Sequence, residues 1–242
     1  MEIDSNGHGK KFTPENRIGH ARSPLPNLPP HPQGASPPGS RCDAATLARQ
    51  AGAGTNVPLR AFDSDGWLVG VDHVPSPNFD ERAAGDIDLL VIHNISLPPD
   101  EFDGDGVQCL FTNTLDLDAH PYYRTIPKGQ VSSHFYIRRD GQLIQFVSVL
   151  QRAWHAGVSI WQGRTRCNDF AVGIELEGSD NVPFTDAQYA VLHDLTTALR
   201  AALPIRGIAG HSDIAPGRKT DPGPYFDWLR YLVGLCFDEY PV

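Results

Sequence analysis

The chain has 242 residues, of which 40% are hydrophobic, so it can bury a substantial core, and we expect one compact domain with a tail. Its formal net charge of -9 argues against a nucleic-acid partner and offers no basic stripe to an anionic membrane surface. No apolar run approaches the roughly 20 residues that span a bilayer, and the first residues lack the apolar core of a secretory signal. These features favour a cytoplasmic protein.

The N-terminal part of the chain differs in composition from the rest. Residues 1–62 are dominated by Pro, Gly, Ser, Asn and Ala and show no sustained apolar period. Such a segment buries too little surface to offset its ordering entropy, so we predict a disordered extension. Residues 63–242 form the predicted domain. Its first strand, residues 66–74, is expected at an edge of a sheet, because prolines follow it directly.

A buried strand, a long loop and a hairpin are predicted next along the chain. Residues 88–93 are a continuous apolar run ending in His93, which is typical of a buried strand whose tip reaches a site. Residues 115–128 are expected to form a long irregular loop along a cleft. Residues 134–147 predict a β-hairpin, because Asp140-Gly141 suits a two-residue primed turn between alternating strands.

The second half alternates strands and helices. Residues 170–178 predict a strand with Gly173, Glu175 and Glu177 on one face. A capping box at Thr185 begins the clearest helix, which ends before Pro204. A short strand over residues 205–210 and a closing helix over residues 225–237 follow. Together the elements predict an α/β or α+β domain with a central mixed β-sheet flanked by helices.

Histidines and a carboxylate at the ends of these elements suggest a metal site. His93, His211 and Asp221 offer the nitrogen and oxygen ligands of a catalytic zinc, which keeps one further position open. Lys219 lies on the same side of an extended segment as Asp221, and Glu175 is a candidate base. Each residue also has an ordinary explanation: a structural histidine, a turn aspartate before proline, a solvated lysine, or a glutamate paired with an arginine.

Five ordered segments resemble the AmpD-type 1,6-anhydro-N-acetylmuramyl-L-alanine amidases, members of the zinc amidase and peptidoglycan recognition protein superfamily. The similarity extends from about Gly66 to the C-terminus. The segments are Val-Ile-His-Asn-Ile-Ser-Leu-Pro-Pro (91–99), Ala-Trp-His-Ala-Gly (153–157), Arg-Cys-Asn-Asp-Phe (166–170), Gly-Ile-Glu-Leu-Glu-Gly (173–178) and Gly-His-Ser-Asp-Ile-Ala-Pro-Gly-Arg-Lys-Thr-Asp-Pro-Gly-Pro (210–224).

The resemblance assigns roles to individual residues. His93, His211 and Asp221 match the family's metal ligands and imply one Zn²⁺ per chain. Glu175 matches the catalytic acid and base, and Lys219 the residue that stabilises the oxyanion. The implied reaction is hydrolysis of the amide bond between N-acetylmuramic acid, in its 1,6-anhydro form, and the L-alanine of a muropeptide in cell-wall recycling. Glu177 is a lower-ranked alternative base.

Substrate contacts are predicted on chemical grounds. Arg166 is a bidentate partner for a stem-peptide carboxylate, Trp154 a cover for a sugar or peptide face, and Asn94 a partner for an amide. A surface arginine, a core tryptophan and a structural asparagine are equally good explanations. His134 and His155 are expected near the cleft or behind the ligands rather than on the metal.

Two other functions compete with this interpretation. A non-catalytic peptidoglycan-recognition module would keep the cleft without the metal, but the ligand set is intact here. A lytic amidase would act on whole murein, which the absence of a secretory signal argues against. We expect a monomer with a muropeptide substrate and no nucleic-acid or membrane partner.

Overall fold

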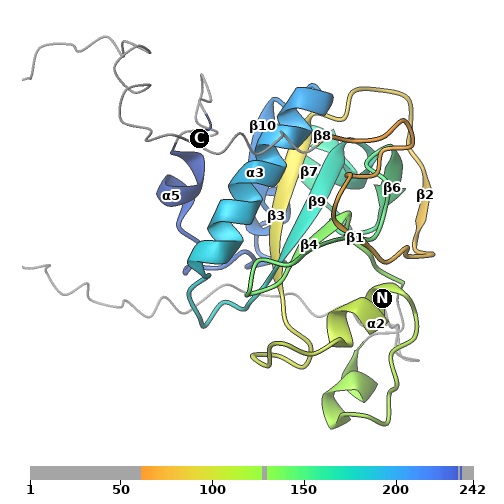
Figure 1. Ribbon diagram of the computed structural model, residues 1–242, viewed down its shortest axis with the longest axis vertical. Helices are drawn as coiled ribbons and strands as arrows, with labels where there is room; N and C mark the ends of the chain where they lie inside the picture. Colours follow the sequence, from red (N-terminus) through yellow and green to blue (C-terminus); the bar gives the residue numbers. More distant parts are fainter. Residues whose placement is uncertain (1–60, 127–129, 234, 236–242) are drawn as a thin grey trace, which may run out of the picture. The chain divides into compact units, whose positions relative to one another are not determined.

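The computed structural model describes residues 61–126, 130–233 and 235 (Figure 1). The predicted N-terminal extension therefore lies outside the described residues, apart from Ala61 and Phe62. Phe62 forms a bridge with Leu68 and packs against the main core. No helix in the described ranges is long and apolar enough to cross a membrane.

The described residues form a six-stranded sheet in the order β1-β5-β4-β9-β3-β10. Only the pair β4 and β5 is antiparallel, and the other neighbours are parallel, which confirms a central mixed sheet. The strands are β1 (Asp72–His73), β3 (Leu89–Ile95), β4 (Phe135–Ile137), β5 (Leu143–Gln145), β9 (Ala171–Glu177) and β10 (Gly207–Gly210). Two antiparallel pairs lie outside it: β2 (Phe79–Glu81) with β6 (Gln151–Ala153), and β7 (Ile160–Trp161) with β8 (Arg164–Thr165).

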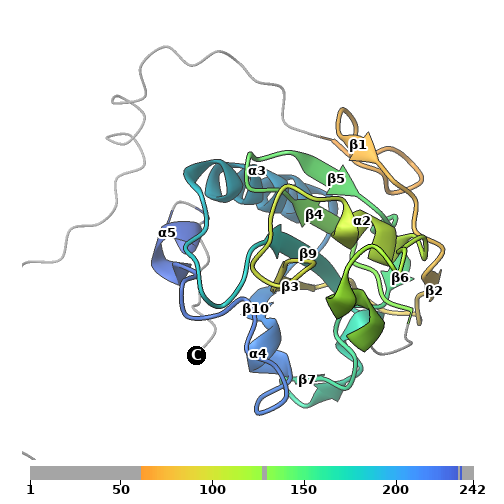
Figure 2. The same cartoon turned by 90° about the horizontal axis from the view of Figure 1, so that it is seen from below.

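One face of the sheet is covered by α3 (Asp186–Ala202) and α5 (Trp228–Leu232) (Figures 1 and 2). The predicted capping box is present, because the Thr185 hydroxyl accepts from the Gln188 backbone N–H and the Gln188 side chain accepts from the Thr185 N–H. The apolar stripe of α3 packs onto the even-numbered residues of β9, including Val172 and Ile174. The alternation in β9 therefore sends the odd-numbered residues to the opposite face.

The opposite face carries α2 (Gly106–Phe111), η1 (Pro121–Thr125), η2 (Cys167–Asp169) and α4 (His211–Ile214). Its buried apolar side chains form two separate clusters, one around Phe111 and Tyr136 and the other around Val91 and Ala209. Figure 2 shows α2 on the side of the sheet away from α3 and α5.

Several predicted elements differ from the structure. The first strand contains only Asp72 and His73, although it does lie at the edge of the sheet. The two-residue primed turn at Asp140-Gly141 is wrong: the Arg138 N–H donates to Gln142, the Gly141 N–H donates back to Arg138, and Gly141 alone of the pair has positive φ. A primed turn of this composition needs positive φ at both central residues, so the connection is a longer loop with a bulge-type glycine.

Short helices were the elements most difficult to predict. Helix α2 was missed because it has no capping side chain and is too short to show a helical period. The predicted irregular loop over residues 115–128 contains η1, and its last two residues lie outside the described part. The closing helix is confined to Trp228–Leu232, shorter than the predicted range 225–237.

Candidate metal centre

Three candidate ligands from distant segments meet at one end of the sheet. His93 lies two residues before the end of β3, and His211 directly follows β10 as the first residue of α4. Strands β3 and β10 are parallel neighbours, with Ile92 opposite Gly210, so the residues that follow each of them emerge side by side. Asp221 lies in the loop after α4. Its backbone carbonyl accepts a hydrogen bond from the Ser212 N–H, which ties this loop to the start of α4.

The donor atoms of the three residues form a nearly equilateral triangle. The Nδ1 of His93 is 3.0 Å from the Nδ1 of His211 and 3.0 Å from the Oδ2 of Asp221. The Nδ1 of His211 is 2.9 Å from the same carboxylate oxygen. Two imidazole nitrogens and one carboxylate oxygen at this spacing can share a cation at the roughly 2 Å bond lengths of zinc. The donor set therefore fits a catalytic zinc site.

Electrostatics favour the protonation states that metal ligands need. Burial lowers the pKa of His93 to about 4, although the neighbouring Asp221 opposes the effect. Burial also opposes ionisation of Asp221, but hydrogen bonds from His211 and His93 outweigh it and hold the pKa of the carboxyl well below its usual range. At neutral pH, His93 is therefore neutral and Asp221 ionised, as metal binding requires.

Glu175 lies beside this triangle. It pairs in register with His93, and its Oε1 is 3.9 Å from the His93 Nδ1. The residue is 8% exposed, and its Oε2 is buried without a hydrogen-bond partner in the described part of the chain. Burial, assisted by the charge of Asp221, raises the pKa of Glu175 well above its usual value, and the charge of Lys219 acts in the opposite direction. A bound cation would also lower this pKa.

Lys219 and Glu177 have different environments from each other. The Lys219 side chain is exposed, yet its charge contributes to the pKa shifts of both His93 and Glu175, so it acts on the same site. Glu177 is 2% exposed, and its two oxygens accept the backbone N–H groups of Asp103 (2.8 Å) and Arg139 (3.0 Å). These two bonds hold two loops in place and argue against Glu177, the lower-ranked alternative, as the base.

Of the predicted substrate contacts, Asn94 has a well-defined structural role. Its side-chain amide donates to the Asp180 carboxylate (2.8 Å) and to the Pro222 carbonyl (3.0 Å). Pro222 directly follows the candidate ligand Asp221, so Asn94 holds that loop against the end of β3. Both amide hydrogens are used in these bonds, which leaves the amide oxygen as the atom that could meet a substrate.

Trp154 and Arg166 also have partners within the protein. A side-chain hydrogen bond from Trp154 helps Arg152 to hold the pKa of Asp80 below its usual range. Arg166 is exposed, has a left-handed backbone (φ 63°) and pairs with Asp169 at 3.0 Å. Their contact with a substrate stays a prediction.

Two residues near the centre were missed by the sequence analysis. The Arg218 guanidinium donates to the carbonyls of Ala156 and Val158, both at 2.7 Å, and its Nη2 lies 3.5 Å from the Nε2 of His211. Asn168 accepts from the backbone N–H groups of His155 and Ala156. The only sequence signal for either residue was its position inside a segment that resembles the family. As expected, neither His134 nor His155 belongs to the ligand triangle.

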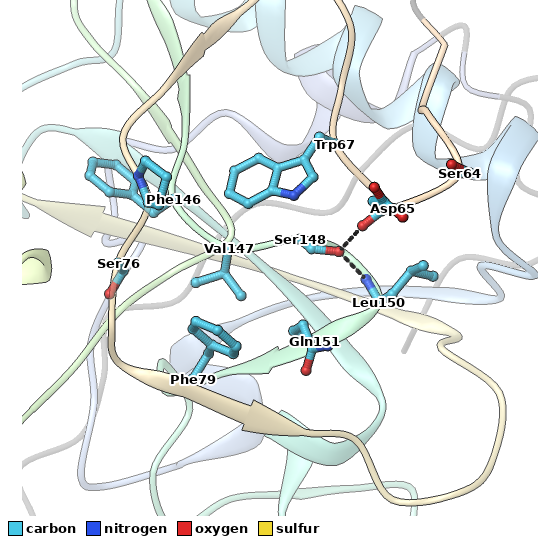
Figure 3. Close-up of a pocket in the computed structure, with 11 residues that line it drawn as sticks. Ser64, Asp65, Trp67, Ser76, Phe79, Phe146, Val147, Ser148, Leu150 and Gln151 are labelled. Atoms are coloured by element: carbon cyan, nitrogen blue, oxygen red, sulfur yellow. Dashed lines mark hydrogen bonds between the residues drawn. The ribbon is translucent and has the colours of Figure 1, made fainter.

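A separate hollow of about 450 Å³ lies between the start of the domain and the β5–β6 connection (Figure 3). Trp67, Phe79 and Phe146 line it with their rings, and Figure 3 shows Gln151 beside them. The Ser148 hydroxyl at its wall is satisfied internally by the Asp65 carbonyl. No residue lining this hollow belongs to the ligand triangle.

Comparisons with known proteins give a matching family and several relatives. The family described as N-acetylmuramoyl-L-alanine amidase matches residues 83–224. The chain is 55% identical over 171 residues to the 1,6-anhydro-N-acetylmuramyl-L-alanine amidase AmpD of Escherichia coli (strain K12), covering 69% of this chain and 93% of that protein. It is 52% identical over 174 residues to the AmpD of Haemophilus influenzae, covering 70% and 95%.

Solved structures give the same result. A crystal structure of a selenomethionine AmpD derivative matches with a TM-score of 0.69 and 53% identity, covering 71% of this chain and 97% of that one. The solution structure of Citrobacter freundii AmpD matches with a TM-score of 0.53 and 52% identity, covering 71% and 94%.

Proposed function

Since the chain belongs to the N-acetylmuramoyl-L-alanine amidase family, we propose that it is a zinc-dependent 1,6-anhydro-N-acetylmuramyl-L-alanine amidase of cell-wall recycling, active in the cytoplasm. Its substrate would be a muropeptide in which an amide bond joins the anhydro sugar to L-alanine. The names of relatives with more than half of their residues identical support this choice of substrate over whole murein.

One observation carries the proposal: a complete ligand triangle stands beside a buried carboxylate oxygen that has no partner among the described residues. His93, His211 and Asp221 would hold one Zn²⁺. A module that only recognises peptidoglycan has no use for this ligand set or for a glutamate kept free of hydrogen bonds. The arrangement therefore favours hydrolysis over binding alone.

Different residues of the chain would have different roles in amide hydrolysis. A zinc ion held by His93, His211 and Asp221 would supply Lewis acidity, which lowers the pKa of water so that hydroxide becomes available near neutral pH. Glu175 takes the proton from the attacking water and returns it to the leaving nitrogen of L-alanine. Because Glu175 is 8% exposed, few water molecules compete for this proton.

Lys219 would act on the oxygen of the attacked carbonyl group. As the carbonyl carbon becomes tetrahedral, its oxygen gains negative charge, and an ammonium nearby stabilises that charge more than it stabilises the neutral carbonyl. Groups in this role contribute roughly 3 kcal/mol each to lowering the barrier in comparable enzymes. The exposed position of Lys219 leaves it free to approach a bound substrate.

Arg166, Trp154 and Asn94 remain our candidates for binding the rest of the muropeptide. The Arg166 guanidinium is exposed and could exchange its pair with Asp169 for a stem-peptide carboxylate. Trp154 is half-buried and could cover a sugar face. Asn94 could accept a peptide N–H with its free amide oxygen, while its amide hydrogens stay on Asp180 and Pro222.

The proposal is tested by measuring zinc content and the release of stem peptide from an anhydromuropeptide, on the full chain and on Glu175→Ala. One zinc per chain with turnover in the full chain and none in Glu175→Ala is the expected result. Bound zinc without turnover of the anhydromuropeptide would indicate whole murein as the substrate. If the full chain shows no bound zinc and no turnover, a recognition module is favoured instead. Release from purified murein sacculi, measured in parallel, separates the first two cases.

A further inference from the structure

Both candidate ligand histidines have their Nε2 atoms against one dipeptide, His155-Ala156. The Nε2 of His211 donates to the Ala156 carbonyl at 3.1 Å. The Nε2 of His93 is 3.0 Å from the Nδ1 of His155. The Nε2 atoms of both rings therefore face the dipeptide His155-Ala156, while both Nδ1 atoms face Asp221.

These contacts determine where the hydrogens lie. A ligand nitrogen must present a lone pair, so neutral His93 and His211 carry their hydrogen on Nε2 when Nδ1 faces a metal. The Ala156 carbonyl can only accept, which selects this form of His211. For His93 the same form requires that the Nδ1 of His155 accepts, and His155 must then carry its own hydrogen on Nε2.

The Nε2 of His155 is buried and has no hydrogen-bond partner among the described residues. Leaving a buried donor without an acceptor costs free energy. Because no hydrogen bond is made at Nε2, such a bond cannot be what orients the His155 ring. Its orientation comes from packing instead. A Cβ at Gly173 would lie 2.5 Å from the Cγ of His155, so the ring occupies space that only glycine leaves open on β9.

Asn168 holds the backbone of the dipeptide. Its Oδ1 accepts from the His155 N–H at 3.2 Å and from the Ala156 N–H at 2.8 Å. One side-chain oxygen thus fixes both the residue that backs His93 and the carbonyl that backs His211. Arg218 adds a second bond to that carbonyl, at 2.7 Å.

We propose that His155 and Asn168 are positioning residues for the metal centre: His155 accepts the Nε2 hydrogen of His93, and Asn168 holds His155 and Ala156 in place behind both histidines. This inference rests on the proposed zinc-dependent function. Neither residue belongs to the ligand triangle, so His155 would act on the metal through His93, and Asn168 through the backbone of His155 and Ala156.

The test compares His155→Asn with His155→Phe. The Oδ1 of asparagine can take the place of the imidazole Nδ1 as an acceptor, whereas phenylalanine keeps the ring and removes the acceptor. Zinc affinity is measured by competition with a chelator of known affinity, together with kcat and KM on an anhydromuropeptide. We expect His155→Phe to bind zinc about 10- to 100-fold more weakly, and His155→Asn to stay within a few-fold of the unsubstituted chain.

Asn168 supplies an independent pair of variants in case the His155 variants fold poorly. Asn168→Asp keeps an acceptor oxygen and should retain zinc affinity, whereas Asn168→Ala removes it and should weaken zinc binding with little change in KM. Circular dichroism of the metal-free variants identifies any that do not fold. Equal zinc affinity in both members of each pair would overturn the inference, because loss of the acceptor would then have no effect.

The unsubstituted chain separates failure of this inference from failure of the proposed function. If the full chain binds zinc and releases stem peptide while both pairs behave alike, only the positioning role is wrong. If the full chain itself binds no zinc, the proposed function is wrong and the inference falls with it.

Discussion

His93 and Glu175 are register partners on the neighbouring parallel strands β3 and β9, so a candidate metal ligand and a candidate base stand side by side on one face of the sheet. Because the ladder of hydrogen bonds fixes their backbones, the length and rotamer of the glutamate side chain determine how near its carboxylate comes to the donor triangle. The observed separation of 3.9 Å from the His93 Nδ1 leaves the carboxylate beside the ligands without joining them.

Glu175→Asp tests this dependence on side-chain length. The substitution keeps a carboxylate but withdraws it by one methylene, and a misplacement of about 1 Å can cost about 100-fold in rate. We expect kcat to fall by this order while zinc content stays at one per chain. Steady-state kinetics with metal analysis measures both, and an unchanged kcat would contradict the role of Glu175 as base.

Zinc binding should stabilise the folded chain through Asp221. A ligand at 1,000 times its dissociation constant stabilises a protein by about 4 kcal/mol, so removing zinc with a chelator should lower Tm by several degrees and adding zinc should restore it. In Asp221→Ala the triangle loses its carboxylate, and this zinc-dependent shift should become small. Differential scanning calorimetry gives the result, and an equal shift in Asp221→Ala would exclude Asp221 as a ligand.

Lys219→Ala should reduce catalysis without affecting the fold. The side chain is exposed, so the free energy of unfolding should change by less than about 0.5 kcal/mol. Loss of a group that stabilises the oxyanion should lower kcat by about 100- to 1,000-fold. Lys219→Arg, which keeps a cation, is the matched control and should retain more activity. A change confined to KM would instead indicate a role in substrate binding.

Gly173→Ala should destabilise the protein by displacing the His155 ring. The added methyl would lie 2.5 Å from the ring, and overpacking of this kind typically costs about 1–3 kcal/mol. Gly207→Ala in β10 is the control, since its methyl would meet no atom closer than 3.4 Å. Urea unfolding of the single variants and of Gly173→Ala/His155→Ala completes the comparison. The free energy of unfolding should fall less in the double variant than the sum of its decreases in the two single variants. Strictly additive decreases would show that the added methyl and the His155 ring do not clash.

Glu177→Gln should affect stability rather than the chemical step. The carboxylate accepts two backbone N–H groups in a buried position, and the amide of glutamine offers only one acceptor oxygen. One N–H would be left without a partner, at a cost of about 1–3 kcal/mol. Thermal unfolding and kcat, measured together, separate the two roles. A loss of kcat as large as that of Glu175→Ala, with unchanged stability, would restore Glu177 as a candidate base.

Local patterns were sufficient for the elements whose signals lie within a few residues. The apolar run of β3, the alternation of β9 and the capping box of α3 each depend on neighbouring residues, and all three are present. The amidase family was likewise accessible, because five ordered segments preserve its residues and spacing. Helix α2 escaped detection because six residues without a capping side chain carry no such local signal.

Long-range contacts decided the roles of individual side chains at the site. Alternation places Glu175 and Glu177 on one face and makes both candidate bases, but Glu177 is engaged by the backbones of Asp103 and Arg139, which are far from it in sequence. Asn168 is likewise an ordinary polar residue until the fold brings its oxygen to the backbone of His155. The sequence by itself determined which groups were available for the chemistry. Only the tertiary structure decided which of them remained free, because hydrogen bonds between distant segments engage the others.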